Sequence, residues 1–522
     1  MKTFPFCDKL ILYEFCRFSG GKRGFLMKKR ETGVLLHISS LPSNHGIGTF
    51  GRSAYEFVDF LVEAGQTYWQ VLPLGPTSYG DSPYQSFSTF AGNPYFTDLD
   101  FLVIDGFLEE KDLEGINWGT EPMYVDYAHI YENRFEVLRK AYKNFMKKGD
   151  VSVLSAFCEK EEKWLGNYAL FMALKNLHGG KCWREWEKPF YSHDEKAIAK
   201  FEKENEEEIG FWKYLQYEFS RQWKNLKNYA NERGIKIIGD LPIYVADDSS
   251  DVWAGPELFD FDEERRPRNV AGVPPDYFSE NGQLWGNPIY NWEIHKKTGY
   301  KWWLERLSSC REKYDVLRID HFRAFADYYC IPFGSETAKT GEWKDGPGMD
   351  LFSRVFEELE GYPIIAEDLG DLSPAVVELL KESGLPGMKI LEFSFGSDDP
   401  NNDCLPYNFS KNCVCYPGTH DNMPVAGWLE TASENEIKFC KEYINYKEGE
   451  DFCDAFIKTV LGTAANTAII AMQDWLGTGK YTRMNEPSTS GGNWQWRLLK
   501  GQADSELAKR MYHHAKLYGR LR

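Results

Sequence analysis

Short apolar runs alternate along the chain with longer segments whose apolar residues recur at helical spacing. Eight apolar runs, most of them ending in polar or charged side chains, cover residues 33–38, 68–74, 235–245, 314–320, 363–366, 388–393, 412–419 and 467–474. Such runs are typical of buried strands. Helical spacing marks residues 130–148, 152–177, 194–232, 296–311, 350–359, 374–383 and 504–517. Strands that alternate with helices predict an α/β fold with a parallel sheet, and eight of them predict a (β/α)8 TIM barrel.

Two stretches are too long for ordinary barrel loops, and we expect both to be insertions in one catalytic barrel that spans residues 27–522. Residues 95–234 are mostly helical in pattern and are expected to cover one side of the barrel. Residues 246–292 show little helical periodicity and contain many Gly, Pro, Asp and aromatic residues. A loop of this length without regular structure usually has a function.

The first 26 residues stand apart from this pattern. They carry Lys2, Asp8 and Glu14 among apolar residues, so they lack the uninterrupted apolar centre of a signal peptide. Met27 opens a more regular stretch. Residues 1–26 are therefore interpreted either as an N-terminal extension outside the native fold or as a weakly ordered arm.

Three carboxylates follow the ends of apolar runs, namely Asp320, Glu367 and Asp421. In a parallel barrel these ends meet at the catalytic face. Asp320 and Glu367 are 47 positions apart, about one β/α unit, so we expect them on adjacent strands, with Asp421 two strands further round. Two carboxyl groups on adjacent strands suit retaining glycoside chemistry, which needs a nucleophile and an acid/base roughly 5–5.5 Å apart.

The residues beside these carboxylates suggest which one acts as nucleophile and which one as general acid. Side chains alternate along a strand, so Arg318 points the same way as Asp320, and a cation there favours the ionised form that a nucleophile needs. Glu367 follows an apolar run and precedes Asp368, conditions expected to raise its pKa as a general acid requires.

Other polar residues are candidates for binding rather than for bond cleavage. Asp421 would bind sugar hydroxyls and favour ring distortion, with His420 and His321 as candidate hydroxyl donors. Asp240 lies within an apolar run, so it is either a structural anchor or a site residue. Tyr84, in a turn-rich loop, could stack on a substrate ring, although a loop tyrosine is more often simply packed.

Other interpretations of the same residues stay open at this point. Arg318 and Asp320 could form an ordinary ion pair at a strand end. Asp, Glu and His are also metal ligands, although the sequence has no H-x-x-E-type cluster and no phosphate-binding glycine loop. A third interpretation is a glucan-binding barrel without catalytic activity. Oligosaccharide turnover measured with and without a chelator separates the three.

The composition of the chain limits the kinds of partner that we expect. The net charge of −18 argues against nucleic acid or an anionic membrane as the main partner, because both require a basic surface. The chain has 17 Trp and 30 Tyr, whose flat rings suit sugars, although a large core accounts for most of them. No apolar run approaches the ~20 residues of a membrane span. The 11 cysteines are scattered without metal-binding spacing, which favours reduced thiols and a cytoplasmic location.

Several motifs together resemble the 4-α-glucanotransferases known as amylomaltases or disproportionating enzymes, which are relatives of the α-amylases. These motifs are Ser-Leu-Pro-Ser at 40–43, Asp-Ser-Pro-Tyr-Gln at 81–85, Gly-Asp-Leu-Pro-Ile-Tyr-Val at 239–245, Leu-Arg-Ile-Asp-His-Phe-Arg at 317–323, Ala-Glu-Asp-Leu-Gly at 366–370, Gly-Thr-His-Asp-Asn at 418–422 and Gly-Gly-Asn-Trp at 491–494. The resemblance runs from about Gly33 to the C-terminus. It implies a (β/α)8 barrel with inserted subdomains and no C-terminal β-domain.

The resemblance also implies roles for single residues. Asp320 would be the nucleophile, Glu367 the acid/base and Asp421 the transition-state stabiliser. The positions that match the donor sugar site are Ser82, Tyr84, Asp240, Arg318, His321, His420 and Asn493. Gln283 and Trp285 match a loop that folds over the glucan.

The implied reaction transfers α-1,4-glucan segments from a donor maltooligosaccharide to the 4-hydroxyl of an acceptor glucan or glucose. Neither a metal nor an organic cofactor is expected, and neither nucleic acid nor a membrane is expected as a partner. The chain departs from the family pattern at Met423-Pro424, which replaces the more usual polar pair after the His-Asp-Asn motif. This departure concerns the local shape near Asp421.

Overall fold

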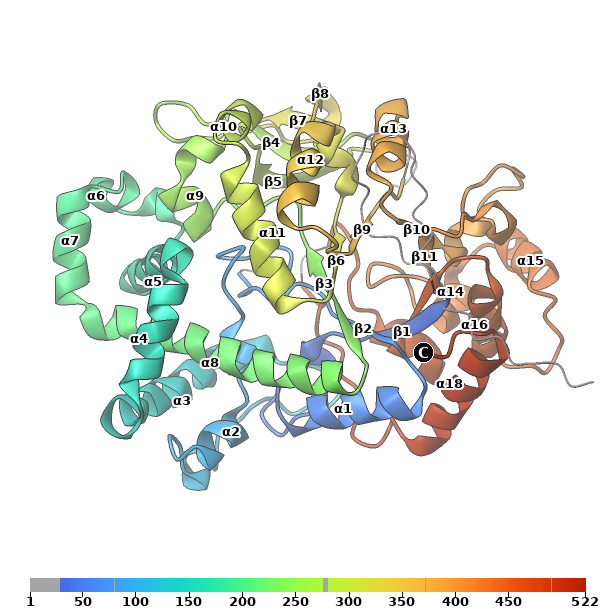
Figure 1. The fold of residues 1–522 in the computed structure, drawn as a ribbon, viewed down its shortest axis with the longest axis horizontal. Helices are drawn as coiled ribbons and strands as arrows, with labels where there is room; N and C mark the ends of the chain where they lie inside the picture. Colours follow the sequence, from blue (N-terminus) through green and yellow to red (C-terminus); the bar gives the residue numbers. More distant parts are fainter. Residues whose placement is uncertain (1–28, 79, 276–279, 371, 490) are drawn as a thin grey trace, which may run out of the picture.

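A computed structural model describes residues 29–78, 80–275, 280–370, 372–489 and 491–522. Figure 1 shows a central group of strands surrounded by helices, with a second group of strands at one end of the molecule. The expectation about residues 1–26 lies outside the described residues.

The central sheet is the predicted barrel, with eight parallel strands in the order β10-β11-β12-β1-β2-β3-β6-β9. The strands are β1 (Glu31–Leu35), β2 (Tyr68–Gln70), β3 (Lys236–Leu241), β6 (Val316–Ile319), β9 (Ile364–Ala366), β10 (Gly387–Ile390), β11 (Cys413–Tyr416) and β12 (Thr467–Ala471). Each lies within or overlaps one of the eight apolar runs. The outer strands β9 and β10 approach each other where the Ala366 N–H donates to the Pro386 carbonyl over 2.9 Å, so the sheet is nearly closed.

The strands are shorter than the apolar runs that predicted them. The second run continues to Leu74, but β2 ends at Gln70. Beyond that point the Leu72 N–H donates to Nδ1 of His37 over 3.2 Å instead of to a neighbouring strand, and Pro73 has no N–H to donate. Leu72 and Leu74 of this run are buried without belonging to a strand.

Helices cover the outside of the barrel (Figure 1). They include α1 (Arg52–Glu63), α11 (Lys301–Lys313), α12 (Gly348–Glu358), α13 (Pro374–Ser383), α14 (Val425–Thr431), α15 (Glu434–Tyr443), α16 (Phe452–Gly462), α17 (Met472–Leu476) and α18 (Ser505–Leu517). The apolar stripe of α1 illustrates why they pack there, since Phe57, Leu61 and their neighbours on one face are buried.

A set of helices between β2 and β3 forms the left side of the molecule in Figure 1. It consists of α2 (Leu99–Ile104), α3 (Tyr127–Lys148), α4 (Val151–Lys160), α5 (Glu162–Leu177), α6 (Lys188–Tyr191), α7 (Glu195–Glu204) and α8 (Glu206–Glu232). Two of the expected helices are interrupted, at Glu161 and at Asn205, where the backbone leaves helical geometry. The long helix α8 packs against α5 and also contacts β3, so it joins this set to the barrel.

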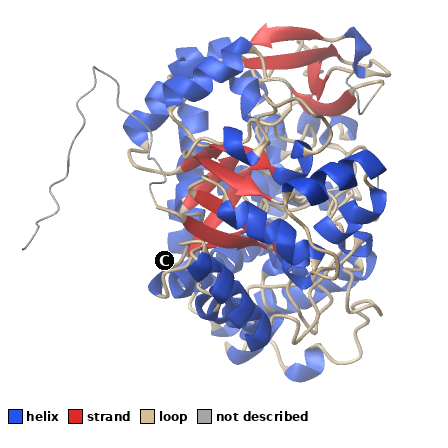
Figure 2. Cartoon of the chain, turned by 90° about the vertical axis from the view of Figure 1, so that its right-hand side faces the viewer, coloured by secondary structure: helices blue, strands red, loops and turns tan. Residues whose placement is uncertain are grey.

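The expectation that residues 246–292 lack regular structure is wrong. The segment contains α9 (Ser250–Ala254), β4 (Asn269–Val273) and β5 (Gln283–Pro288), and α10 (Trp292–Lys297) begins at its end. With β7 (Asp327–Pro332) and β8 (Glu342–Asp345) these strands form an antiparallel sheet in the order β5-β4-β7-β8. Figure 2 shows this sheet above the barrel. Its strands are short and contain Gly, Asn and Pro, so they lack the alternation that marks a strand in a sequence.

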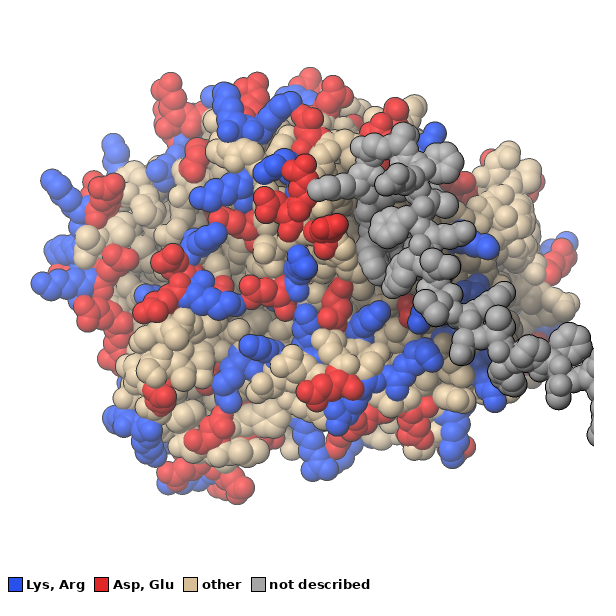
Figure 3. Space-filling model, in the orientation of Figure 1, with Lys and Arg blue, Asp and Glu red and all other residues tan. Residues whose placement is uncertain are grey.

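The surface in Figure 3 carries acidic and basic side chains side by side, without a face of one sign. No helix in the described part of the chain is long and apolar enough to cross a membrane.

Candidate active site

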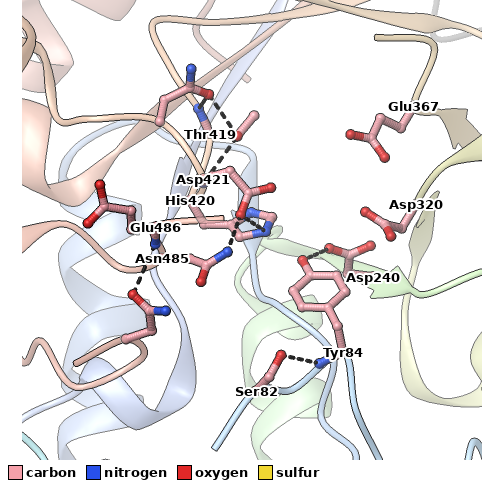
Figure 4. A network of polar contacts seen from close by, with 12 residues as sticks. Ser82, Tyr84, Asp240, Asp320, Glu367, Thr419, His420, Asp421, Asn485 and Glu486 are labelled. Carbon is pink, nitrogen blue, oxygen red and sulfur yellow. Dashed lines mark hydrogen bonds and ion pairs between the residues drawn. The ribbon is translucent and has the colours of Figure 1, made fainter. Parts of the chain in front are cut away.

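The predicted carboxylates lie at the C-terminal ends of barrel strands and face a common space (Figure 4). The strand β6 pairs with β9, so Asp320 and Glu367 follow adjacent strands, as expected. Asp421 follows β11, beyond β10, which confirms the expected order around the barrel. The side chains of Asp320, Glu367 and Asp421 are 26%, 18% and 40% exposed, so a ligand can reach all three.

Backbone hydrogen bonds fix the first two carboxylates. The Asp320 N–H donates to the Leu241 carbonyl over 3.0 Å, and the Glu367 N–H donates to the Ile319 carbonyl over 3.1 Å. Both residues are therefore held as if they were the last members of their strands. Their side chains project from a rigid edge.

Arg318 links the carboxylates on this side of the site. Its Nη1 donates to both oxygens of Asp240, over 2.7 and 2.6 Å. Its Nη2 lies 3.1 Å from Asp320 and 3.2 Å from Glu367. The predicted pairing of Arg318 with Asp320 is confirmed, but Arg318 serves three carboxylates rather than one. Since its side chain is 2% exposed, desolvation strengthens this network.

The expected protonation of the pair is reversed in the substrate-free structure. Burial raises the pKa of Asp320 well above its ordinary value, and the negative charge of Glu367 raises it further, although Arg318 opposes the rise. Burial alone would also raise the pKa of Glu367, but Arg318 and the backbone N–H of His321 outweigh it and leave that pKa below its ordinary value. Arg318 has the larger effect, and the 2.5 Å hydrogen bond from the His321 N–H to Oε2 of Glu367, which no sequence pattern predicts, lowers the pKa of Glu367 further. The two shifts therefore run opposite to the expectation, with the pKa of Asp320 raised and that of Glu367 lowered.

His321 makes that hydrogen bond because its backbone is left-handed, with φ of 49°. This conformation costs a non-glycine residue on the order of 1–2 kcal/mol. Burial lowers the pKa of the His321 ring to about 4, so the ring is neutral at pH 7 and can donate a hydrogen bond from one nitrogen only.

The opposite side of the site is built around Asp421. Nε2 of His420 lies 3.4 Å from Asp421 Oδ1, and Nδ2 of Asn485 donates to the same oxygen over 2.6 Å. Nη2 of Arg483 donates to the Asp421 backbone carbonyl over 2.8 Å. Sequence reasoning missed Asn485 and Arg483, which lie in an irregular loop. Their only signal was that this loop leads into the Gly-Gly-Asn-Trp motif.

Tyr84 connects the two sides. Its hydroxyl donates to Asp240 Oδ2 over 2.7 Å, and its ring stacks on His420 with centroids 5.2 Å apart and planes at 10°. Ser82 Oγ accepts the Tyr84 N–H over 3.2 Å and so supports the loop. The Asp240 side chain is fully buried, so it acts here as an anchor for Arg318 and Tyr84.

Trp285 and Gln283 approach the site from the antiparallel sheet. Both lie on β5, and the Trp285 Nε1–H donates to Gln283 Oε1 over 3.1 Å. The Trp285 ring meets the His321 ring edge to face at 4.8 Å. The sheet that the sequence did not reveal therefore delivers both residues to the site.

Asn493 bonds within its own loop. Its Oδ1 accepts the Glu486 N–H over 3.0 Å, and its Nδ2 donates to Thr489 over 3.1 Å. It thus braces the segment that carries Asn485. Its contact with a sugar stays a prediction.

The described residues contain no group of three or more His, Cys, Asp or Glu side chains arranged to hold a metal ion. The chemistry that these side chains offer is instead acid/base and nucleophilic. Two adjacent carboxyl groups lie beside one guanidinium group, and a third carboxylate faces them across an open space. This arrangement suits cleavage of a glycosidic bond.

Comparisons with known proteins agree with this geometry. A profile of the 4-alpha-glucanotransferase family matches residues 36–502. The chain is 50% identical to the 4-alpha-glucanotransferase of Clostridium butyricum, over 93% of this chain and 100% of that protein. It is 45% identical to the 4-alpha-glucanotransferase of Thermus thermophilus, over 94% of this chain and 99% of that protein.

The fold agrees as well. The structure of amylomaltase from Streptococcus agalactiae in complex with acarbose superposes with a TM-score of 0.93 at 45% sequence identity, covering 95% of this chain and 100% of that one. Amylomaltase from Corynebacterium glutamicum shares the fold at 18% identity, with a TM-score of 0.74. The chain therefore belongs to the 4-alpha-glucanotransferase family.

Proposed function

We propose that this enzyme transfers α-1,4-glucan segments from a donor maltooligosaccharide to the 4-hydroxyl of an acceptor glucan or glucose through a covalent glycosyl-enzyme on Asp320. The observation that carries the proposal is the position of Asp320 and Glu367 at 3.1 and 3.2 Å from one nitrogen of Arg318. Two carboxyl groups this close together favour a retaining mechanism, because an inverting one needs room for a water between them.

In the first step Glu367 donates its proton to the glycosidic oxygen while Asp320 attacks the anomeric carbon. The bond to the leaving sugar breaks, and an ester bond to Asp320 forms. In the second step the 4-hydroxyl of the acceptor attacks the same carbon, the ester bond to Asp320 breaks and frees the Asp320 carboxylate, and the Glu367 carboxylate takes up the hydroxyl proton. Two displacements retain the anomeric configuration.

In the free enzyme the opposed pKa shifts favour a proton on Asp320 over one on Glu367, so the substrate must reverse this preference. A glycosidic oxygen placed against Glu367 accepts a hydrogen bond from its protonated form only, so binding favours that form. An anomeric carbon with growing positive charge favours the ionised form of Asp320.

The other residues would stabilise the transition state. The Asp421 carboxylate, oriented by Asn485, faces the position of the oxocarbenium-like ring. The rings of His321 and His420 would bond sugar hydroxyls, and Tyr84 would offer its face to the sugar. The acarbose complex of the S. agalactiae relative supports oligosaccharide binding in this fold.

Transfer also requires that an acceptor sugar competes with water, which is present at ~55 M. Trp285, beside His321, offers an apolar plane that would cover the glycosyl-enzyme and bind the acceptor.

The nine described cysteines are free thiols, as a reducing compartment maintains them, and on that ground we place the enzyme in the cytoplasm.

Trapping of the intermediate tests the proposal. With an activated glucosyl donor, Glu367→Gln should accumulate a glycosyl-enzyme detectable by mass spectrometry, because its second step lacks a base. Asp320→Asn should trap none and should lose several powers of ten in kcat. Equal trapping by both variants would reverse the two roles, and loss of activity in a chelator that Ca²⁺ restores would contradict a metal-free mechanism.

A further inference from the structure

Two carboxyl groups that the mechanism does not use also lie at the ends of barrel strands. Glu392 follows β10 in the 3-10 turn Leu391–Ser394, and Asp474 follows β12 in α17. The strands β10 and β12 flank β11 on either side. Glu392 and Asp474 are only 6% and 2% exposed, so they lie beneath the turn that carries Asp421 rather than in the open site.

Glu392 is packed against that turn. Its N–H donates to the Pro417 carbonyl over 3.1 Å. A Cβ placed on Gly418 would lie 3.0 Å from Glu392 Oε1 and 2.8 Å from the Cβ of Asn422, so only glycine leaves the two side chains this close to the backbone. The Glu392 carboxyl group and the Asn422 side chain thus meet at Gly418, and Asn422 lowers the pKa of Glu392.

Asn422 in turn fixes the shape of the turn. Its Oδ1 accepts hydrogen bonds from the N–H and the hydroxyl of Thr419, both over 2.9 Å. The Thr419 Oγ1 accepts the Asp421 N–H over 3.4 Å. Since Oδ1 accepts these two bonds, the NH₂ group is the part of the Asn422 amide that is left for Glu392. A chain of contacts therefore leads from Glu392 through Asn422 and Thr419 to Asp421.

We propose that Glu392 is a positioning residue, whose buried carboxyl group fixes the Asn422 amide and thereby holds the turn that presents Asp421 to the substrate. The inference rests on the proposed function, in which Asp421 acts on the sugar. No contact between Glu392 and the substrate is involved.

The surroundings of Glu392 favour the neutral form of its carboxyl group. The groups that face it are the Asn422 amide, Asp474 of α17, Cys440 of α15 and Arg483. Burial raises the pKa of Glu392 well above its ordinary value, and the charge of Asp474 raises it further, while Asn422 and Arg483 oppose the rise.

Two contacts support the neutral form. Arg483 is engaged elsewhere, with the carbonyls of Asp421 and Asn485. Among the described residues no hydrogen-bond partner reaches Glu392 Oε1, and an unpartnered oxygen of a buried carboxylate would be costly. We therefore expect glutamine, which has the same shape and no charge, to take over the role of Glu392.

The test compares Glu392→Ala with Glu392→Gln, using maltotriose as donor and acceptor. Glu392→Ala should lower kcat by about 10–100-fold and change KM by less than about threefold, because Asp421 acts mainly in the transition state. Glu392→Gln should keep kcat within about threefold of the wild type and move the alkaline limb of the kcat profile to higher pH. The position of the alkaline limb in the kcat profile of Glu392→Gln tests the proposal even if Glu392→Ala does not fold.

A double variant locates the route of the effect. If Glu392 acts through Asn422, then Glu392→Ala combined with Asn422→Ala should be no more than about threefold slower than the slower single variant. If the losses in kcat of the two single variants multiply in the double variant, Glu392 acts by another route and the proposal is overturned.

Glu218 offers a matched control, because it is a buried glutamate of α8 whose pKa burial also raises. Glu218→Ala and Glu218→Gln should reduce stability without changing kcat or the alkaline limb. The inference is overturned if Glu392→Ala keeps wild-type kcat, or if the alkaline limb of Glu392→Gln is unchanged. Failure of the proposed function is distinguishable, because Asp421→Asn would then also keep its kcat.

Discussion

The two sides of the active site are built in different ways. On the Arg318 side, Asp320 and Glu367 extend adjacent strands, and their backbones are bonded to the neighbouring strands. On the Asp421 side, the carboxylate lies five residues beyond the end of β11, in a turn held by side chains from separate loops. The first side is fixed by the sheet and by one buried cation, whereas the second is fixed mainly by amide groups.

This difference determines how each side should fail. A network of buried charges loses several contacts when its central cation changes shape. A turn braced by separate hydrogen bonds loses them one at a time. Four substitutions at the site and around it separate these two kinds of failure.

Replacement of Arg318 by lysine should have the largest effect. Lysine keeps the charge but is a single point donor, so it cannot serve Asp240, Asp320 and Glu367 together. We expect kcat/KM to fall by about 100-fold or more, since small displacements of reacting groups cost that much. The matched control is Arg520→Lys, at a buried arginine that bonds only backbone carbonyls and should affect stability alone. An Arg318→Lys enzyme within a few-fold of wild type would show that the network is not needed.

Replacement of Asn485 by alanine should have a smaller effect, because it removes a single hydrogen bond to a charged group, worth about 1.5–3 kcal/mol. We expect kcat to fall about tenfold or somewhat more, while KM changes little. Asn231→Ala is the control, since the Asn231 amide bonds the Asp315 carboxylate over 2.8 Å before β6, at the opposite end of the barrel. Equal losses of kcat in both variants would mean that Asn485 is merely structural.

Replacement of Trp285 by alanine tests the cover over the Arg318 side. It should lower transfer from maltotriose a few-fold more than hydrolysis, so that products shift from glucose plus longer maltodextrins toward glucose and maltose. Chromatography of early products measures the ratio. Trp343→Ala, on the far edge strand β8 of the same sheet, should leave the ratio unchanged. A uniformly slower enzyme with an unchanged ratio would show that water is excluded elsewhere.

The smallest effect concerns the pH dependence of stability near the Asp421 turn. Burial raises the pKa of Asp474 to about 7, while its Oδ1 accepts the Val425 N–H. Between the ordinary aspartate pKa and pH 7 the folded state therefore binds more protons than the unfolded state, so this group makes folding less favourable as pH rises. Asp474→Asn should gain stability relative to wild type between pH 5 and 8, by on the order of 2 kcal/mol. Urea unfolding at pH 5 and pH 8 measures the free energy of unfolding of both proteins. A difference between Asp474→Asn and the wild type that is the same at both pH values would contradict the prediction.

The barrel and the Arg318 side could be predicted from the sequence for a physical reason. Buried parallel strands are continuous apolar runs, and side-chain alternation places Arg318 beside Asp320 without knowledge of the fold. The order of Asp320, Glu367 and Asp421 around the barrel follows from counting strands.

The parts that escaped prediction depend on contacts between distant segments. The strands of the antiparallel sheet are short and irregular, and pairing defines them. The protonation of Asp320 and Glu367 depends on the left-handed backbone of His321, which gives Glu367 its N–H. Asn485, Arg483 and Glu392 act on the Asp421 turn from other loops. No pattern within a single segment of the sequence predicts such contacts.

The antiparallel sheet is assembled from two hairpins that leave the barrel at different places. The strands β4 and β5 follow β3, β7 and β8 follow β6, and β4 is the neighbour of β7. Neither hairpin can be deleted alone, because the loss of one would leave an unpaired edge strand on the other. Shortening of this cover, by evolution or by an engineer seeking a more open cleft for branched or bulky acceptors, must therefore remove or redesign two separate insertions in concert.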